Sequence, residues 1–337
     1  MLVDAPEVRR SVDDAAPNSE HRINRTRAVV GRVVLAIVFA GTAIAIYRQR
    51  DSIADTLREL GLGPVLLSGV FGLVGVAATF PLWRDVLAGL GIRMPWISGA
   101  RVFFISQLGK YVPGSIWPVV MQMEAGRARG ASRRTMLAAN LITVVLGCAV
   151  GLVLACAFLP AYNAVALEHY WWLFLALPLL LALLHPRAMT KILDWLFGLL
   201  HRPPLGERLQ PRYEMRAVGW SLLSWAALGA QLLVLCAALG HGGLSAYILC
   251  IGAIAFAVSA GVLLVPVPAG AGIRDVVLTV VLTAMLSSGQ ALAVAIASRV
   301  VLIFCDVLLA LMASLLRNRR TRDGTVEPAD SGELSRP

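Results

Sequence analysis

The chain has 337 residues, of which 58% are hydrophobic and only 15% charged, and its mean hydropathy is +0.74. A soluble domain has about 25% charged residues, and several apolar runs here approach or exceed the roughly 20 residues that cross a bilayer, so the composition excludes a soluble protein. The net charge of +10 does not indicate a nucleic-acid partner, because the arginines cluster at the ends of apolar runs, where they meet anionic headgroups.

Both ends of the chain are polar, and the apolar runs lie between them. Residues 1–27 lack the apolar stretch of a cleavable signal peptide. Because 1–27 and 317–337 are polar and of mixed charge, we expect both to be disordered cytoplasmic tails. Residues 28–316 are predicted to form one all-α, polytopic transmembrane domain. The apolar runs predict about eight transmembrane helices, at 28–47, 62–83, 135–159, 169–185, 217–239, 245–265, 274–287 and 291–316.

One further apolar segment, 96–121, is interrupted. It contains SQLGKYVPGSIWP (106–118), in which Lys110 is followed closely by Pro113 and Gly114. Proline removes a backbone donor, and glycine permits a tight reversal of the chain. The segment is therefore predicted to be re-entrant: it enters and leaves the membrane on the same side and turns at the Pro-Gly pair.

The distribution of Lys and Arg supports this re-entrant path. With the N-terminus inside and 96–121 re-entrant, the arginine-rich loop at 186–216 and the C-terminal tail both face the cytoplasm, as the positive-inside rule requires. If 96–121 crossed fully, both would face outward. In the re-entrant topology, only one outer loop, 48–61, carries Lys or Arg. We therefore expect a multi-pass protein of the plasma (inner) membrane with both termini cytoplasmic.

A second interruption lies in the C-terminal half. Residues 263–275 read LLVPVPAGAGIRD, so two prolines and two glycines break an apolar run just before Arg274 and Asp275. Interrupted segments in corresponding positions are typical of transporters built from repeats, whose broken helix ends meet at a substrate site near mid-membrane. Non-helical backbone at that depth requires surrounding protein or a water-filled cavity. The pattern suggests an internal pseudo-repeat, although no residue-by-residue repeat is visible.

Charged side chains inside apolar segments are the candidates for function, because Lys or Arg at the bilayer centre costs roughly 2.5–3.5 kcal/mol on insertion scales. Lys110 could line a cavity or snorkel to the interface. Asp275 could bind substrate or complement the dipole at the start of a helix. Arg299 and Asp306 share a face of the last predicted helix, so they could pair or face other partners. The candidates are Lys110, Arg274, Asp275, Arg299 and Asp306.

The sequence lacks the residue patterns of a membrane enzyme. It contains no Asp-x-Asp metal pair, His-Glu-x-x-His, Gly-x-Ser-x-Gly or Walker motif. The five histidines are scattered, and the five cysteines lie in apolar runs without metal-ligand spacing. We therefore expect a protein that is not an enzyme, with no catalytic residue, metal or cofactor. No soluble segment is long enough for a nucleotide-binding domain.

Three motifs, QLGKYVPGSIW, VPVPAGAGIRD and ASRVVLIF, resemble the lysylphosphatidylglycerol synthase transmembrane-region family over roughly residues 30–316. The first motif is the more specific, because a Lys/Arg-Tyr-x-Pro-Gly run followed by Trp is unusual. In the second, the family commonly shows Pro-Gly-Gly-x-Gly-x-Arg-Glu, and here Ala269 and Asp275 replace a glycine and the glutamate. The resemblance implies that the charged positions of the family are Lys110, Arg274, Asp275 and Arg299.

The resemblance also implies a flippase-like domain. In full-length aminoacyl-phospholipid synthases this region moves the modified lipid between leaflets, and a separate soluble domain makes it; we expect no such domain here. Stand-alone relatives are associated with polyprenyl-phosphate or glycolipid pathways of the cell envelope. The expected function is movement of an anionic phospholipid or polyprenyl-phosphate-linked glycolipid through a cleft lined by the two broken segments. The expected substrate-binding residues are Lys110, Tyr111, Pro113, Gly114, Trp117, Arg274, Asp275 and Arg299.

Two other functions stay open. The protein could be an accessory or scaffolding partner of envelope glycolipid enzymes, or a membrane-embedded transferase that uses Lys110 or Asp275. Tyr111 and Trp117 could likewise belong to an interfacial aromatic belt instead of a lipid-binding cleft. The expected partners are membrane lipids with anionic headgroups and, under the accessory function, envelope-biosynthesis enzymes; no nucleic acid is expected.

Overall fold

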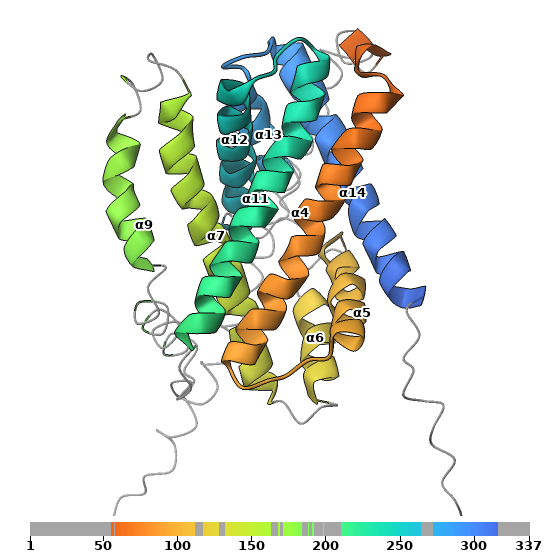
Figure 1. Ribbon diagram of the computed structural model, residues 1–337, viewed down its shortest axis with the longest axis vertical. Helices are drawn as coiled ribbons and strands as arrows, with labels where there is room; N and C mark the ends of the chain where they lie inside the picture. Colours follow the sequence, from red (N-terminus) through yellow and green to blue (C-terminus); the bar gives the residue numbers. More distant parts are fainter. Residues whose placement is uncertain are drawn as a thin grey trace, which may run out of the picture.

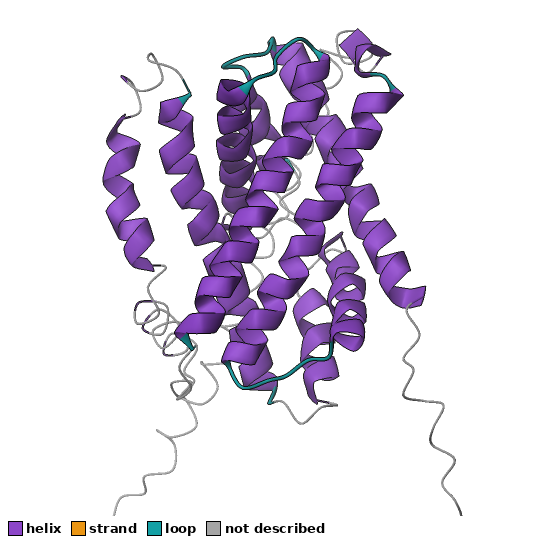
Figure 2. Cartoon of the chain, in the orientation of Figure 1, coloured by secondary structure: helices purple, strands orange, loops and turns teal. Residues whose placement is uncertain are grey.

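The computed structural model describes residues 55–111 apart from position 57, 117–127, 132–162, 171–183, 210–263 and 272–315, with the single positions 168, 188, 191 and 198. Within these residues the regular structure is entirely helical (Figure 2), which confirms the all-α prediction. Five helices are long and apolar enough to cross a membrane, so the chain is a polytopic membrane protein. They are α4 (Leu62–Gly89), α7 (Arg133–Ala161), α11 (Pro211–Ala238), α12 (Leu244–Leu263) and α14 (Ser288–Leu315).

These five helices coincide with five of the predicted spans, and two of them, α4 and α11, extend furthest beyond the predicted bounds. Beyond the predicted 62–83 and 217–239, α4 continues to Gly89 and α11 begins at Pro211. The apolar pattern ends at the first charged residues, whereas backbone hydrogen bonding continues past them. The predicted span 28–47 and both predicted tails lie outside the described residues, so the count of eight spans stays a prediction.

The antiparallel helices α4 and α11 form the centre of the bundle (Figure 1). Two buried polar contacts set their register: Ser224 Oγ donates to Gly75 O at 2.8 Å, and Gln231 Nε2 donates to Ser68 Oγ at 2.8 Å. Ser298 Oγ of α14 donates to Gln231 Oε1 at 3.0 Å and extends the contact to a third helix. Such bonds hold transmembrane helices together where the hydrophobic effect does not.

The predicted re-entrant segment forms two short helices that lie side by side in the lower half of Figure 1. These are α5 (Trp96–Gln107), which ends in the 3₁₀ turn η1 (Leu108–Tyr111), and α6 (Trp117–Arg127). A buried bond from Gln122 Nε2 to Ser106 Oγ, at 2.7 Å, joins them. The chain thus returns to the end of the molecule from which it came. Its re-entry into a bilayer stays a prediction, and the predicted turn at 113–114 lies outside the described residues.

The second interrupted segment leads into a helix that is shorter than the predicted span at 274–287. Helix α13 (Ile273–Leu282) has 10 residues, a length of about 15 Å, which is half of a bilayer core. It packs against α12 and α14. Hydropathy reports how apolar a segment is and does not report where the helix within it begins and ends. The sequence therefore did not show that α13 is only about half as long as the bilayer core is thick.

The predicted span at 169–185 is described as the 3₁₀ helix η2 (Trp171–Ala176) followed by α9 (Leu177–Leu183). Both pack against α7, at the side of the bundle (Figure 1). The described part is too short to be counted among the membrane-crossing helices.

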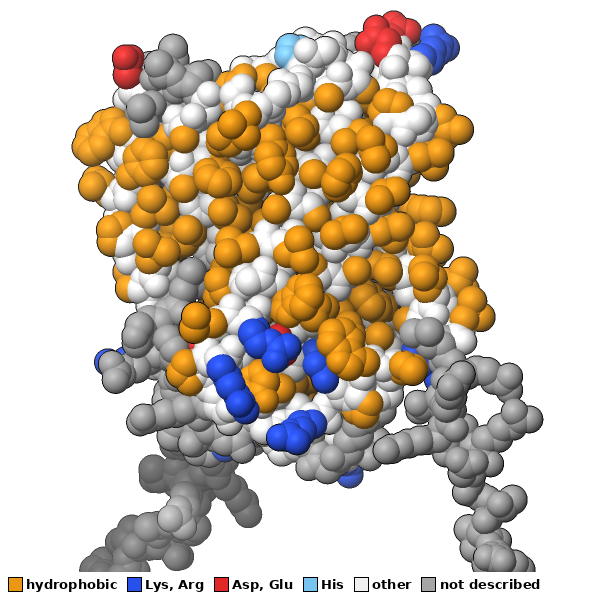
Figure 3. Space-filling model, viewed as in Figure 1, with side chains coloured by type: hydrophobic (Ala, Val, Ile, Leu, Met, Phe, Trp, Pro, Cys, Tyr) orange, Lys and Arg blue, Asp and Glu red, His pale blue; other side chains and the backbone are white. Residues whose placement is uncertain are grey.

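Apolar and basic side chains separate on the surface. Hydrophobic side chains cover the middle and upper parts of the face in Figure 3, and Lys and Arg gather toward its lower end. The exposed apolar side chains of the bundle include Val70 and Val74 of α4 and Val300 and Phe304 of α14, as expected of helices that face lipid tails. The described arginines near the lower helix ends are Arg84, Arg93, Arg101, Arg127, Arg133, Arg134, Arg212 and Arg216.

Close helix packing at Gly229 gives a test of the fold. A Cβ atom at this position of α11 would lie 2.3 Å from Cγ1 and 3.0 Å from Cα of Ile251 in α12. Because one of these atoms is backbone, Gly229→Ala must push the helices apart, and we expect a loss of about 1–3 kcal/mol. The measurement is the midpoint of thermal unfolding in detergent. Gly219→Ala, on the same helix with no atom within 4 Å, is the control, and equal midpoints would contradict this packing.

Candidate functional site

Three elements bring charged side chains together: the turn η1, the first turn of α13 and the middle of α14. Tyr111 of η1 and Asp306 of α14 are 195 positions apart in the chain and share a hydrogen bond. Arg274 of α13 lies within electrostatic range of both and of Arg299. We name this group the charged cluster, and its members are Lys110, Tyr111, Arg274, Asp275, Arg299 and Asp306.

Asp306 joins the first interrupted segment to the last helix. Its Oδ2 lies 2.8 Å from the Lys110 ammonium and also accepts a hydrogen bond from the Tyr111 hydroxyl. The Asp306 side chain is 4% exposed and that of Lys110 is 34% exposed. The Lys110 ammonium is thus directed at a carboxylate of the bundle, which disfavours the snorkelling alternative.

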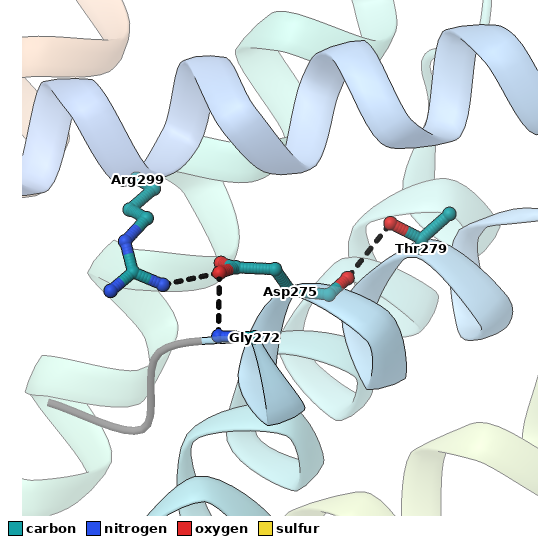
Figure 4. A network of polar contacts seen from close by, with 4 residues as sticks. All are labelled: Gly272, Asp275, Thr279 and Arg299. Atoms are coloured by element: carbon teal, nitrogen blue, oxygen red, sulfur yellow. Dashed lines mark hydrogen bonds and ion pairs between the residues drawn. The ribbon is translucent and has the colours of Figure 1, made fainter. Parts of the chain in front are cut away.

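Asp275 has a second, separate partner. Ile273 opens α13, and Gly272 precedes it with φ of 84°, a left-handed conformation that favours glycine. The Asp275 carboxylate accepts a hydrogen bond from the Gly272 N–H at 3.2 Å, and Arg299 of α14 donates to the same oxygen (Figure 4). The structural alternative for Asp275, a place in the first turn of a helix, is therefore confirmed. The carboxylate caps α13 and also fixes it to α14.

These contacts decide between the alternatives left open for α14. Arg299 and Asp306 do not pair with each other: Arg299 binds Asp275, and Asp306 binds Lys110. Each ion pair joins α14 to one of the interrupted segments. Asp306 was a candidate because it is a charged residue inside an apolar run, but it was not among the expected substrate-binding residues.

Arg274 is the cation of the cluster without a contact partner. Among the described residues, its side chain makes no hydrogen bond and no ion pair, although both carboxylates of the cluster lie within electrostatic range. It is half-buried. The cluster contains three cations and two carboxylates, and both carboxylates are paired. One positive charge therefore remains uncompensated within the described part of the bundle.

Of the eight expected substrate-binding residues, five lie in the charged cluster: Lys110, Tyr111, Arg274, Asp275 and Arg299. Pro113 and Gly114 lie outside the described residues. Trp117 opens α6, and its side chain is also outside the description. The described residues hold no group of three or more His, Cys, Asp or Glu side chains that could bind a metal ion. What the cluster offers chemically is cationic hydrogen-bond donors in a largely apolar bundle, an arrangement that attracts phosphate or carboxylate.

Comparison with known proteins identifies a family for nearly the whole bundle. The family model described as "Lysylphosphatidylglycerol synthase TM region" matches residues 29–310. The match includes every member of the charged cluster. A search of curated proteins finds no match.

Proposed function

The chain belongs to the lysylphosphatidylglycerol synthase TM-region family, and from this premise we propose that it moves a lipid with an anionic headgroup between the leaflets of the membrane. The candidate lipids are an anionic phospholipid and a polyprenyl-phosphate-linked glycolipid. The charged cluster would bind the headgroup, while the acyl or prenyl chains stay in the bilayer. Transport without chemistry suits the cluster, because both of its carboxylates are engaged by cations.

The uncompensated Arg274 is the observation that carries this proposal. Even a half-buried cation in an apolar bundle is costly unless it is paired, and the described residues supply no contact partner for Arg274. A guanidinium binds two phosphate oxygens with parallel hydrogen bonds. Because Arg274 stands at the start of a half-length helix that follows the second interruption, its position also matches the place where interrupted-helix transporters bind substrate.

The arrangement of the arginines supports one orientation of the protein in the membrane. The described arginines near the lower helix ends outnumber those of the upper connections, where 239–243 and 283–287 contain no Lys or Arg. Under the positive-inside rule the lower end is cytoplasmic. We therefore propose a protein of the plasma membrane, with the α5–α6 hairpin inserted from the cytoplasmic side and both termini cytoplasmic.

Removal of Arg274 is the experiment that tests the function. In proteoliposomes, wild-type protein is expected to accelerate the movement of a fluorescent anionic phospholipid, and Arg274→Ala is expected to slow it by about tenfold or more, the effect of losing one charge-assisted bidentate contact. Lys110→Ala is expected to slow movement as well. The measurement is the fraction of labelled lipid that a membrane-impermeant reductant quenches with time.

Two controls separate function from folding. Arg93→Ala removes an exposed arginine of the α4–α5 connection, outside the cluster, and is expected to keep the wild-type rate. Arg274→Ala breaks no ion pair among the described residues, so its elution and thermal unfolding should match wild type. If folded Arg274→Ala moves lipid as fast as wild type, the cluster is not the headgroup site. If wild type moves no lipid, transport is contradicted and the accessory function is favoured.

A further inference from the structure

The charge of the cluster restricts the lipids that it can hold. Lys110 is paired with Asp306 and Arg299 with Asp275, so among the described residues Arg274 supplies a single positive charge in excess. The segments that adjoin Tyr111 and Gly272 in the sequence, 112–116 and 264–271, contain no ionisable side chain. They therefore leave the formal charge of the two interrupted segments unchanged.

In surroundings of low dielectric constant, a net charge is expensive and a balanced one is not. One bound negative charge neutralises the cluster, whereas two leave it with an excess negative charge. A phosphodiester carries one charge. A phosphomonoester, whose second pKa is about 6, carries close to two charges at pH 8. An amine on the headgroup brings its own positive charge, and no free carboxylate is left in the cluster to receive it.

The contacts available to Arg274 also favour a ligand with one negative charge. A single guanidinium presents a planar fork that fits the two free oxygens of one phosphodiester. A dianionic headgroup would need a second cation, and within the charged cluster it could gain one only by taking Lys110 from Asp306 or Arg299 from Asp275. Either exchange leaves a buried carboxylate without its cationic partner.

From this balance we infer that the cluster selects lipids whose headgroup carries one phosphodiester charge and an uncharged alcohol or sugar. This inference deepens the proposed function and rests on its assignment of the charged cluster as the headgroup site. Phosphomonoester lipids, pyrophosphate-linked lipids and lipids with amine headgroups are selected against.

The test measures binding and charge preference together. Purified full-length protein in detergent is titrated at pH 8 with short-chain phosphatidylglycerol, phosphatidic acid and phosphatidylethanolamine, and affinity is read from the shift in thermal unfolding. Wild type is expected to bind phosphatidylglycerol about fivefold more tightly than either of the others, because only this lipid balances the charge. Asp306→Asn raises the excess to two positive charges while it keeps an acceptor for Tyr111, and it is expected to shift the preference to phosphatidic acid.

Glu124→Gln is the matched control, since it neutralises an exposed acid of α6 outside the cluster, and it should keep the wild-type order. Equal or tighter binding of phosphatidic acid by wild type overturns the inference. So does an unchanged order in Asp306→Asn, or the absence of binding by all three lipids. Lipid movement is measured separately in proteoliposomes: the expected preference in binding together with no movement would contradict the transport function and leave the selectivity of the cluster intact.

Discussion

Asp275→Ala is expected to lower the free energy of unfolding by about 3 kcal/mol, the largest effect of a single substitution in the cluster. It leaves the partly buried Arg299 without a partner, and removal of one partner from a buried pair costs roughly 3–5 kcal/mol. It also removes the acceptor of the Gly272 N–H at the start of α13, which costs about 0.5–2 kcal/mol. We place the expectation at the low end because the side chain of Arg299 is 24% exposed. The measurement is unfolding of the purified protein in detergent.

Two control variants separate the loss of the Asp275 charge from the loss of another polar group in α13. Asp275→Glu keeps the negative charge and introduces the glutamate that the family commonly carries at this position. This variant should therefore retain most of the stability. Thr279→Val removes a hydroxyl of the same helix whose bond among the described residues is to the Asp275 carbonyl oxygen, and a loss of under about 1 kcal/mol is expected. If Asp275→Ala is no more harmful than Thr279→Val, the pair with Arg299 does not hold α13 to α14.

Asp306→Leu is the second large effect, with an expected loss of about 2–3 kcal/mol. The substitution removes the shared acceptor of Lys110 and Tyr111 and leaves the Lys110 ammonium without its ion-pair partner. The cost lies below that of a fully buried pair, because about a third of the Lys110 side chain is exposed. The readout is again the midpoint of unfolding in detergent.

A double-mutant cycle tests the pair itself. Lys110→Met removes the ammonium and keeps much of the stem, so Lys110→Met with Asp306→Leu replaces an ion pair by apolar side chains. Such replacements are often neutral, and the double variant should therefore be more stable than Asp306→Leu alone. Simple additivity of the two single losses would show that the two side chains do not interact.

Much of the membrane architecture could be predicted from local pattern. Apolar runs of membrane-spanning length predicted the five long helices of the described residues, and the interruption of 96–121 predicted that α5 and α6 run in opposite directions. The ends of α4 and α11 were missed, because hydropathy falls at the first charged side chain while the helix continues. The ion pair between Arg216 of α11 and Asp85 of α4 joins the two extensions and helps to stabilise both.

The sequence by itself determined that this is a helical membrane protein with two interrupted segments, and its motifs indicated the family, because hydropathy, helix breakers and short motifs are properties of neighbouring residues. Only the tertiary structure decided the partners of the charges. The spacing of Arg299 and Asp306 on one helix face permitted a pair, and the bundle instead directs them to Asp275 and Lys110. Such contacts depend on how α5, α13 and α14 pack, and no local pattern encodes them. The same packing leaves Arg274 as the one cation of the charged cluster with no described partner.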